Sequence, residues 1–296
     1  MITFYELGGL GRLGNQLFQY AATRALSLKN GYEIKIPNPT TRNWHGQDCL
    51  LDKFNIEAGS LQEEDLKGIE YQYNEPDYMF YDSDFTNLPD NGNLSGFFQS
   101  TYYFLGFDEQ IRKELTPKDE FLTVGVQRIS EIKKNNPGYE IVSLHLRRGD
   151  NTDNSNPSPE LNEMYGKSRD LELDSFYGKY FVNAKKKFAG QKVKFLIFSG
   201  GSRQSGNDNE SDIDWCKRNF TGDEFLFAEG GDSMTDFCSI MSCDHNILSH
   251  ISSFGWWAAF LNQNKDKKVV APLRYHPDMP YHTYREGFYP ENWIIV

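Results

Sequence analysis

The most informative stretch of the sequence, residues 141–150, places a histidine, two arginines and an aspartate after alternating apolar residues, IVSLHLRRGD. The alternation predicts a strand in which His145 and Arg147 project from the same face, at its carboxyl end. An arginine there offers a planar fork that suits two phosphate oxygens, and Asp150 could hold that arginine in place. We interpret the stretch as an anion-binding site. An Arg–Asp pair that only stabilises a loop is the alternative.

A second candidate anion site is SHISSFGWW at 249–257. A strand is predicted to end near His250, and Ser252 or Ser253 is placed to cap the helix that follows. The free N–H groups and the dipole of a helix N-terminus bind anions, and Gly255 permits close approach. The alternative is an ordinary serine cap on a buried helix, which does not exclude a phosphate.

The third motif, Gly9–Gly14, satisfies G-x-G-x-x-G between a predicted strand and a predicted helix. This is the context of a dinucleotide-binding turn. A ribose-binding acid belongs at the end of the second strand, whereas Glu33 stands at its start. Asn15 and Gln16 could reach a ligand, and the alternative is a tight turn with Asn15 as the helix N-cap.

Several carboxylates are ambiguous. Asp236 opens a predicted helix, where it could be a favourable charge in the first turn or accept from the ring N–H and amino group of a purine. Asp82 with Asp84, and Asp212 with Asp214, have D-x-D spacing that could hold a metal with a nucleotide. Both pairs lie in loop-like sequence, which favours solvated charge. We therefore predict no metal site.

The elements that must position these residues alternate between strand and helix. Predicted strands are followed by predicted helices, which indicates parallel sheets covered on both faces. Polar stretches at 151–169 and 199–212 begin where strands end, the edge at which such sheets bind ligands. Residues 40–93 give a poor signal. The predicted strands are 2–7, 32–37, 140–147, 192–198, 224–229, 245–250 and 268–272, and the helices are 15–29, 123–139, 174–188, 233–243 and 253–263.

Composition narrows the function classes. The chain has 296 residues and a net charge of −11, which argues against nucleic acid or an anionic membrane as a general partner. No signal peptide is recognisable, and the longest apolar run, 254–261, is too short to span a membrane. The four cysteines lack disulfide-type or metal-type spacing. We expect a cytosolic protein without an integral membrane segment, which could act peripherally at the inner face of a membrane.

Three stretches together resemble the α-1,2-fucosyltransferases of glycosyltransferase family 11: GRLGNQLFQYA (11–21), HLRRGD (145–150) and DFCSIMSCDHNILSHISSFGWWAAFL (236–261). The resemblance implies an α/β fold of GT-B type, with two Rossmann-like domains facing a cleft. Residues 1–138 would form the acceptor-side domain and 139–296 the domain that binds GDP-fucose. Where family members often carry FSDD, this chain has FSGG at 198–201.

The resemblance also implies roles for individual residues. Arg147 would stabilise the departing diphosphate, and Asp150 would act as base or orient Arg147. The residues that would bind substrate are Asn15, Gln16, His145, Arg148, Ser199, Asp236, Ser252, Ser253 and Phe254. Rings of the first domain could stack on the acceptor sugar, although at least two of the four are expected to be core; these are Phe97, Phe98, Tyr102 and Tyr103.

The activity implied is inverting transfer of L-fucose from GDP-β-L-fucose to O2 of a terminal galactose, without a metal or other cofactor. The acceptor would be a galactose-terminated oligosaccharide, which could be lipid-linked, in the synthesis of a surface polysaccharide such as an O-antigen. Two rivals remain. One is a non-catalytic protein that binds GDP-sugars or glycans, and the other is an NAD-dependent oxidoreductase that uses the Gly9–Gly14 loop.

Overall fold

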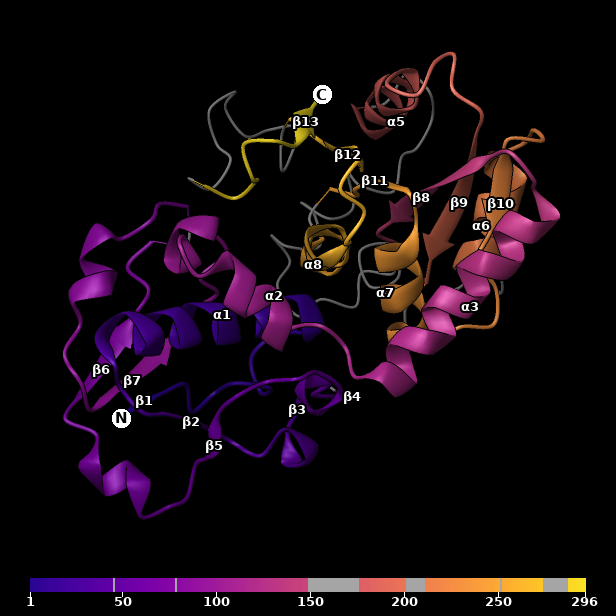
Figure 1. Ribbon diagram of the computed structural model, residues 1–296. Helices are drawn as coiled ribbons and strands as arrows, with labels where there is room; N and C mark the ends of the chain where they lie inside the picture. Colours follow the sequence, from indigo (N-terminus) through magenta and orange to yellow (C-terminus); the bar gives the residue numbers. More distant parts are fainter. Residues whose placement is uncertain (45, 78, 149–175, 201–210, 251, 274–286) are drawn as a thin grey trace. The chain divides into compact units, whose positions relative to one another are not determined.

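The computed structural model describes residues 1–44, 46–77, 79–148, 176–200, 211–250, 252–273 and 287–296 (Figure 1). The chain forms two compact units: Met1–Lys118 with Thr283–Glu291, and Asp119–His282 with Asn292–Val296. The units divide before the helix at 119–135, whereas the sequence analysis divided the chain after it.

The first unit is built on a five-stranded parallel sheet in the order β5-β2-β1-β7-β6. Helix α1 (Leu13–Asn30) packs on one face of this sheet, where it buries an apolar stripe that includes Leu17 and Phe18. Helix α2 (Asp108–Glu114) packs on α1. The strands are β1 (Ile2–Thr3), β2 (Ile34–Ile36), β5 (Gly59–Ser60), β6 (Tyr71–Asn74) and β7 (Gly92–Ser95).

The segment with a poor signal consists largely of short pieces, as its sequence predicts. Its last strands, β6 and β7, were not predicted, because four residues give too few alternations to stand out. The hairpin strands are β3 (Asn43–Trp44) and β4 (Gln47–Asp48), and the 3-10 helices are η1 (Pro39–Thr41), η2 (Leu51–Lys53), η3 (Asp65–Gly68), η4 (Ser83–Asn87) and η5 (Thr101–Phe104).

A buried ion pair holds α2 against α1. The carboxylate of Glu114 is fully buried, and it accepts hydrogen bonds from Arg24 Nη2 at 2.8 Å and Gln110 Nε2 at 2.6 Å. The hydroxyl of Tyr20 donates to the same carboxylate, and burial raises the pKa of Tyr20. The charge of Glu114 is therefore fully compensated.

We expect Glu114→Gln to lower the free energy of unfolding by about 3 kcal/mol, because it leaves the mostly buried Arg24 without its main counter-charge. Glu64→Gln is the matched control, since Glu64 pairs with Lys67 at 2.6 Å on the exposed surface and should cost less than about 1 kcal/mol. Urea unfolding of both variants measures the difference. Equal losses would contradict the structural role of the Glu114 cluster.

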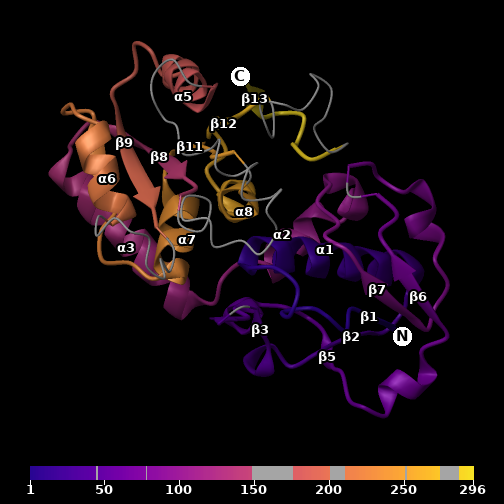
Figure 2. The same ribbon diagram turned by 180° about the vertical axis from the view of Figure 1, so that it is seen from behind.

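The second unit contains a six-stranded parallel sheet in the order β10-β9-β8-β11-β12-β13 (Figure 1; Figure 2 shows it from behind). This is the strand order of a Rossmann fold. The strands are β8 (Glu140–Leu146), β9 (Val193–Ser199), β10 (Phe225–Phe227), β11 (His245–Ile247), β12 (Val269–Ala271) and β13 (Ile294–Ile295). The five strands predicted from the sequence are all present, and β13 was missed. Two α/β units with parallel sheets confirm the predicted fold class.

Helices cover both faces of the second sheet. Val142, Leu144 and Leu146 of β8 pack in a core with residues of α5 and α6. The alternate residues of β8 face the other side, where Ser143 contacts Asn246 and His145 contacts residues at the start of α8. Helix α3 packs on α7. The helices are α3 (Asp119–Asn135), α5 (Phe176–Lys186), α6 (Asp212–Asn219), α7 (Ser233–Ser242) and α8 (Ser253–Leu261).

Candidate functional site

The strand order of the second unit reverses between β8 and β11. From β8 the chain builds outward through β9 and β10, and it then returns to β11 and builds the other way through β12 and β13. Ligands of open α/β sheets bind outside the carboxyl ends of the strands at such a switch point. His145 lies near the end of β8, Arg147 directly follows this strand, and Ser249 and Ser252 follow β11. The structure therefore brings the two candidate anion-binding motifs to neighbouring strand ends.

A serine–histidine contact joins these motifs. Ser252 caps α8 by accepting a hydrogen bond from Gly255 N at 3.3 Å, and its Oγ lies 3.2 Å from His145 Nδ1. The ring of Phe254 lies 5.6 Å from that of His145. A Cβ atom at Gly255 would lie 2.7 Å from His145 Nδ1, so only glycine lets the helix start this close to the strand end. Ser253 is the first residue of α8 and is partly exposed.

Burial keeps His145 neutral. Loss of water, and secondarily the positive charge of Arg147, lower the pKa of His145 to about 3. The imidazole therefore carries no charge at neutral pH and can serve as a neutral hydrogen-bonding group beside an anion. Since the folded state favours the neutral form, this group contributes stability above its unfolded pKa of about 6.5, and that contribution falls as the pH drops toward the folded value.

The two adjacent arginines have different environments. The main-chain N–H of Arg147 donates to Ser249 Oγ at 2.9 Å, which ties the end of β8 to the segment after β11, and Arg147 is partly exposed. Arg148 was predicted to bind substrate, but it is buried: its Nε donates to Asp212 at 3.2 Å and its Cζ lies 3.7 Å from the ring centre of Trp215. Arg148 thus fastens α6, and Arg147 is the better candidate for an anionic ligand.

The same contact corrects the interpretation of the second D-x-D pair. Asp212 is 4% exposed and opens α6, so it is a buried partner of Arg148 rather than solvated charge. Asp214 is exposed and lies 3.5 Å from Lys217. In the first pair, Asp82 caps η4 by accepting from Asp84 N at 2.9 Å. Within the residues that the structure describes, no group of three or more His, Cys, Asp or Glu side chains could hold a metal ion.

Ser199 and Asp236 stand at the same edge of the sheet. The hydroxyl of Ser199 donates to Leu146 O at 3.0 Å and so joins the ends of β9 and β8. Asp236, in the first turn of α7, accepts from Arg128 Nη1 at 2.8 Å. Burial raises the pKa of Asp236, and Arg128 opposes that rise. Asp150 and Gly201 lie outside the described residues.

Aromatic rings connect Asp236 with the switch point. The ring of Phe237, the next residue in α7, lies 5.3 Å from that of Phe254, which in turn contacts His145. The start of α7, the start of α8 and the end of β8 therefore border one region of the second unit. Sequence reasoning missed Arg128, because no motif marks it and its partner is 108 residues away.

In the first unit, hydrogen bonds of side-chain amides hold the glycine-rich loop in place. The N-cap of α1 is Arg12, so the suggestion that Asn15 caps this helix is wrong. Asn15 Oδ1 accepts from Gln99 Nε2 at 2.6 Å, which ties the loop after β1 to the segment after β7. Gln16 is buried and donates to Gly11 O at 3.0 Å. Gln99, which follows the unpredicted strand β7, was missed by the sequence analysis.

The four candidate acceptor rings divide between core and surface. Phe98 and Tyr103 are 0% and 3% exposed, which confirms that at least two of the four are core. Tyr102 is 39% exposed, and its ring packs edge-on against Tyr81 at 5.6 Å. Phe97 is partly exposed, and its N–H donates to Glu75 at 2.7 Å. Tyr102 is therefore the ring best placed to meet a ligand.

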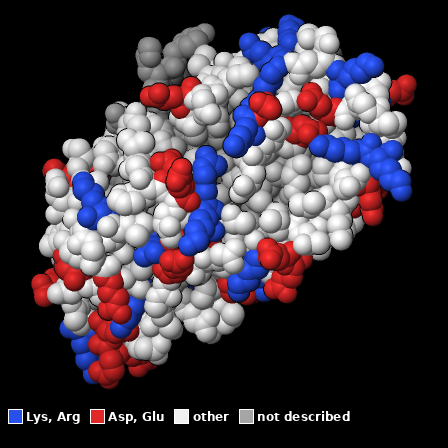
Figure 3. Space-filling model, in the orientation of Figure 1, with Lys and Arg blue, Asp and Glu red and all other residues white. Residues whose placement is uncertain are grey.

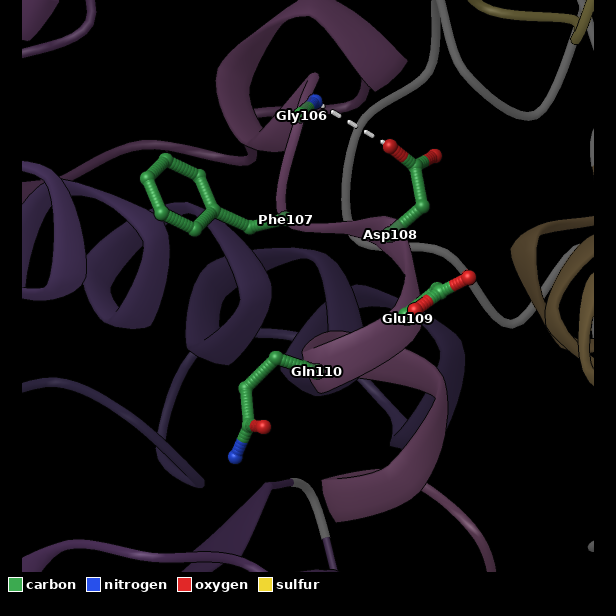
Figure 4. A pocket seen from close by; sticks show the side chains of 5 residues that line it. All are labelled: Gly106, Phe107, Asp108, Glu109 and Gln110. Atoms are coloured by element: carbon green, nitrogen blue, oxygen red, sulfur yellow. Dashed lines mark hydrogen bonds between the residues drawn. The ribbon is translucent and has the colours of Figure 1, made fainter.

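A hollow of about 350 Å³ opens at the start of α2, and none of the predicted site residues lines it (Figure 4). The carboxylate of Asp108 in its wall accepts from Gly106 N at 3.1 Å. Its two carboxylates make it a poor place for a phosphate. Its lining residues are Gly106, Phe107, Asp108, Glu109 and Gln110.

The distribution of charged side chains agrees with the composition, which argues against nucleic acid as a general partner. On the face shown in Figure 3, Lys and Arg lie interspersed with Asp and Glu, so this face offers no continuous basic surface to a nucleic acid. In the described part of the chain, no helix is long and apolar enough to cross a membrane.

Comparison with known proteins identifies the family. The model of glycosyl transferase family 11 matches residues 2–296. Similar proteins include alpha-1,2-colitosyltransferase of Escherichia coli, 25% identical over 97% of this chain and 96% of that protein. Galactoside 2-alpha-L-fucosyltransferase Sec1 of Mus musculus is 25% identical over 97% of this chain and 72% of the relative. Among solved structures, fucosyltransferase NodZ from Bradyrhizobium superposes with a TM-score of 0.48 at 10% identity, covering 87% of this chain and 91% of that one. Because the family model spans nearly every residue, the resemblance is confirmed, and the chain belongs to glycosyl transferase family 11.

Proposed function

We propose that the chain transfers L-fucose from GDP-β-L-fucose to O2 of a terminal galactose, with inversion and without a metal ion. Membership of glycosyl transferase family 11 supports sugar transfer, and a relative named galactoside 2-alpha-L-fucosyltransferase supports the donor and linkage. The observation that carries the proposal is the Ser252–His145 contact of 3.2 Å at the switch point, next to Arg147. It joins a helix N-terminus, a neutral imidazole and an arginine, the groups that a diphosphate needs.

The diphosphate is the leaving group of this reaction. As the bond between fucose C1 and the phosphate oxygen breaks, negative charge grows on the diphosphate and positive charge on the sugar ring. Arg147 and the positive end of the α8 dipole stabilise the diphosphate because they are already in place before the bond breaks. Galactose O2 attacks C1 from the opposite face, so the configuration inverts. Its proton passes to a base, for which we propose Asp150.

Asp236 would recognise the guanine of the donor by hydrogen bonding. A carboxylate accepts the parallel ring N–H and amino N–H of guanine, and adenine lacks this pair of donors. Asp236 stands beside Phe237, whose ring reaches Phe254 at the switch point. We place the diphosphate at the ends of β8 and β11 and the purine toward the start of α7. Ser199, which was predicted to bind substrate, joins the ends of β9 and β8 through Leu146 O, at the edge where we place the donor.

A second candidate for the donor sugar is colitose, because an Escherichia coli relative named alpha-1,2-colitosyltransferase aligns over 97% of this chain. Colitose is L-fucose without the hydroxyl at C3, so both sugars can share one diphosphate and base site. The acceptor glycan would belong to a surface polysaccharide such as an O-antigen, assembled in the cytosol or at the inner face of a membrane, where it could be lipid-linked.

The test is to incubate the protein with GDP-fucose or GDP-colitose and a panel of galactosides in excess EDTA, and to determine the product linkage by NMR. We expect an α-1,2-linked product. Binding of GDP without turnover on any acceptor would favour the non-catalytic rival, and turnover that requires added Mg²⁺ would contradict the metal-free mechanism. The oxidoreductase alternative requires binding of NAD. Its candidate for binding the ribose, Glu33, precedes β2 instead of following it. The side chain of Glu33 is 64% exposed, and its Oε1 lies 3.6 Å from Lys35 Nζ.

Acceptor binding gives a separate prediction at Tyr102. Tyr102→Ala should raise the KM for the galactoside about three- to tenfold, the loss of one ring contact, and leave the KM for GDP-fucose unchanged. Tyr139→Ala removes an equally exposed tyrosine from the second unit and is the control. Initial rates with each substrate varied give both constants. If both KM values rise together, the Tyr102 ring serves the fold and not the acceptor.

A further inference from the structure

Arg128 makes two hydrogen bonds at the carboxyl edge of the second sheet. Its Nη1 donates to Asp236 Oδ1 at 2.8 Å, and its Nη2 donates to Glu229 O at 2.8 Å. The Arg128 side chain is 17% exposed and that of Asp236 is 26% exposed. The guanidinium of Arg128, which comes from α3, thus links the first turn of α7 to the segment after β10.

The surrounding backbone is shaped to admit this bridge. Helix α3 lies so close to α7 that a Cβ atom at Gly125 would be 2.4 Å from the main-chain carbon of Cys238. Gly125 is three residues before Arg128 and so lies on the same side of α3. A Cβ atom at Gly231 would lie 2.6 Å from Asp236 Oδ1 and 2.7 Å from Arg128 Nη1. Two glycines therefore leave the space that the Arg128–Asp236 pair occupies.

The bridge determines which way Asp236 presents its carboxylate. Oδ1 is held by Arg128, whereas Oδ2 makes no hydrogen bond to any of the residues described by the structure. With one oxygen held by a planar guanidinium, the carboxylate is restricted in rotation, and less conformational freedom is lost when a ligand binds to it. Burial raises the pKa of Asp236, and the positive charge of Arg128 opposes that rise and so favours the ionised form, which an acceptor of two N–H groups needs.

We propose that Arg128 is a positioning residue for nucleobase selection, which fixes the Asp236 carboxylate so that it can accept the ring N–H and the amino N–H of guanine together. The proposal rests on the proposed function and adds a specificity device to it. Loss of Arg128 lets the carboxylate rotate, and this rotation weakens the second hydrogen bond, which goes to the guanine amino group.

Inosine diphosphate isolates this effect, because it differs from GDP only by the missing amino group. Isothermal titration should show that the wild-type protein binds GDP about 10-fold or more tightly than IDP, the effect of one hydrogen bond to a charged group. In Arg128→Gln the GDP/IDP ratio should fall to within about threefold of one. Binding of inorganic pyrophosphate should stay within about twofold of wild type, and Arg128→Lys should restore part of the ratio.

Lys133→Gln is the matched control, because Lys133 also leaves α3 and pairs with an aspartate, Asp244, at 2.6 Å. Asp244 Oδ2 accepts from Ile141 N near the start of β8, the opposite end of the strand from His145, so the control should leave the ratio unchanged. An unchanged GDP/IDP ratio in Arg128→Gln, or equal loss of GDP, IDP and pyrophosphate, overturns the positioning role.

The wild-type protein separates this proposal from the proposed function. If it binds GDP and transfers the sugar but does not prefer GDP to IDP, nucleobase selection by the Arg128–Asp236 pair is wrong while the transfer reaction stands. If it binds no GDP at all, the proposed function fails first, and the selection proposal fails with it.

Discussion

Arg147→Ala should lower kcat by about 10²- to 10³-fold, because the departing diphosphate loses a preorganised cation at the switch point. Arg147→Lys should recover little of this activity, since an ammonium group cannot make the two parallel hydrogen bonds of a guanidinium. Lys217→Ala, which removes an exposed cation of the same unit, is the control. Single-turnover rates with GDP-fucose and a galactoside measure the effect.

The neighbouring Arg148 is predicted to matter for stability, whereas Arg147 is predicted to matter for activity. Arg148 is buried against Asp212 and Trp215, so Arg148→Ala should destabilise the fold by about 3–5 kcal/mol, the cost of leaving a buried charge unpaired. Arg147→Ala should leave the thermal midpoint near that of wild type. Near-normal turnover by a well-folded Arg147→Ala protein would remove Arg147 from the mechanism, and a large loss of stability would make its role structural.

Gly255→Ala should abolish most of the activity, although an alanine in a helix is usually favourable. The added methyl group would lie 2.7 Å from His145 Nδ1, and this ring is buried against Ser252 and Phe254. Either α8 or the end of β8 must shift, which should cost about 1–3 kcal/mol of stability and at least about tenfold in kcat/KM, because small misplacements of catalytic groups are costly.

Gly68→Ala is the matched control, since a Cβ atom there meets no other atom within 4 Å, and it should be nearly neutral. Adding His145→Ala to Gly255→Ala should recover much of the lost stability without restoring activity, because it removes the clash together with a site residue. Wild-type activity in the single Gly255→Ala variant would show that the close approach of α8 to His145 is not needed.

Local sequence predicted most of the second unit because β8 and β9 have seven residues each and β11 and β12 are fully buried. The seven residues of β8 were enough to predict a strand that carries His145 near its carboxyl end, and His145 lies there, with Arg147 directly after the strand. The serine cap of α8 was predicted from the residues between a strand and an apolar helix. The first unit was predicted less well, because β5 has two residues and β6 and β7 have four each, and periodicity needs more.

By itself, then, the sequence determined the parallel α/β class, the strand ends that carry the candidate anion-binding residues, and the family, because each follows from residues close together in the chain. Only the tertiary structure showed which of two chemically equivalent residues, adjacent in the sequence, is buried in an ion pair. It assigned Arg148 to a buried pair because Asp212 and Trp215 arrive from α6, 64 or more residues away. It joined Arg128 to Asp236 because α3 packs closely on α7. It joined Asn15 to Gln99 because the parallel strands β1 and β7 end at the same edge of the first sheet. Which side chain faces a ligand depends on such distant partners, because burial and charge compensation are properties of the packed fold and not of the local pattern.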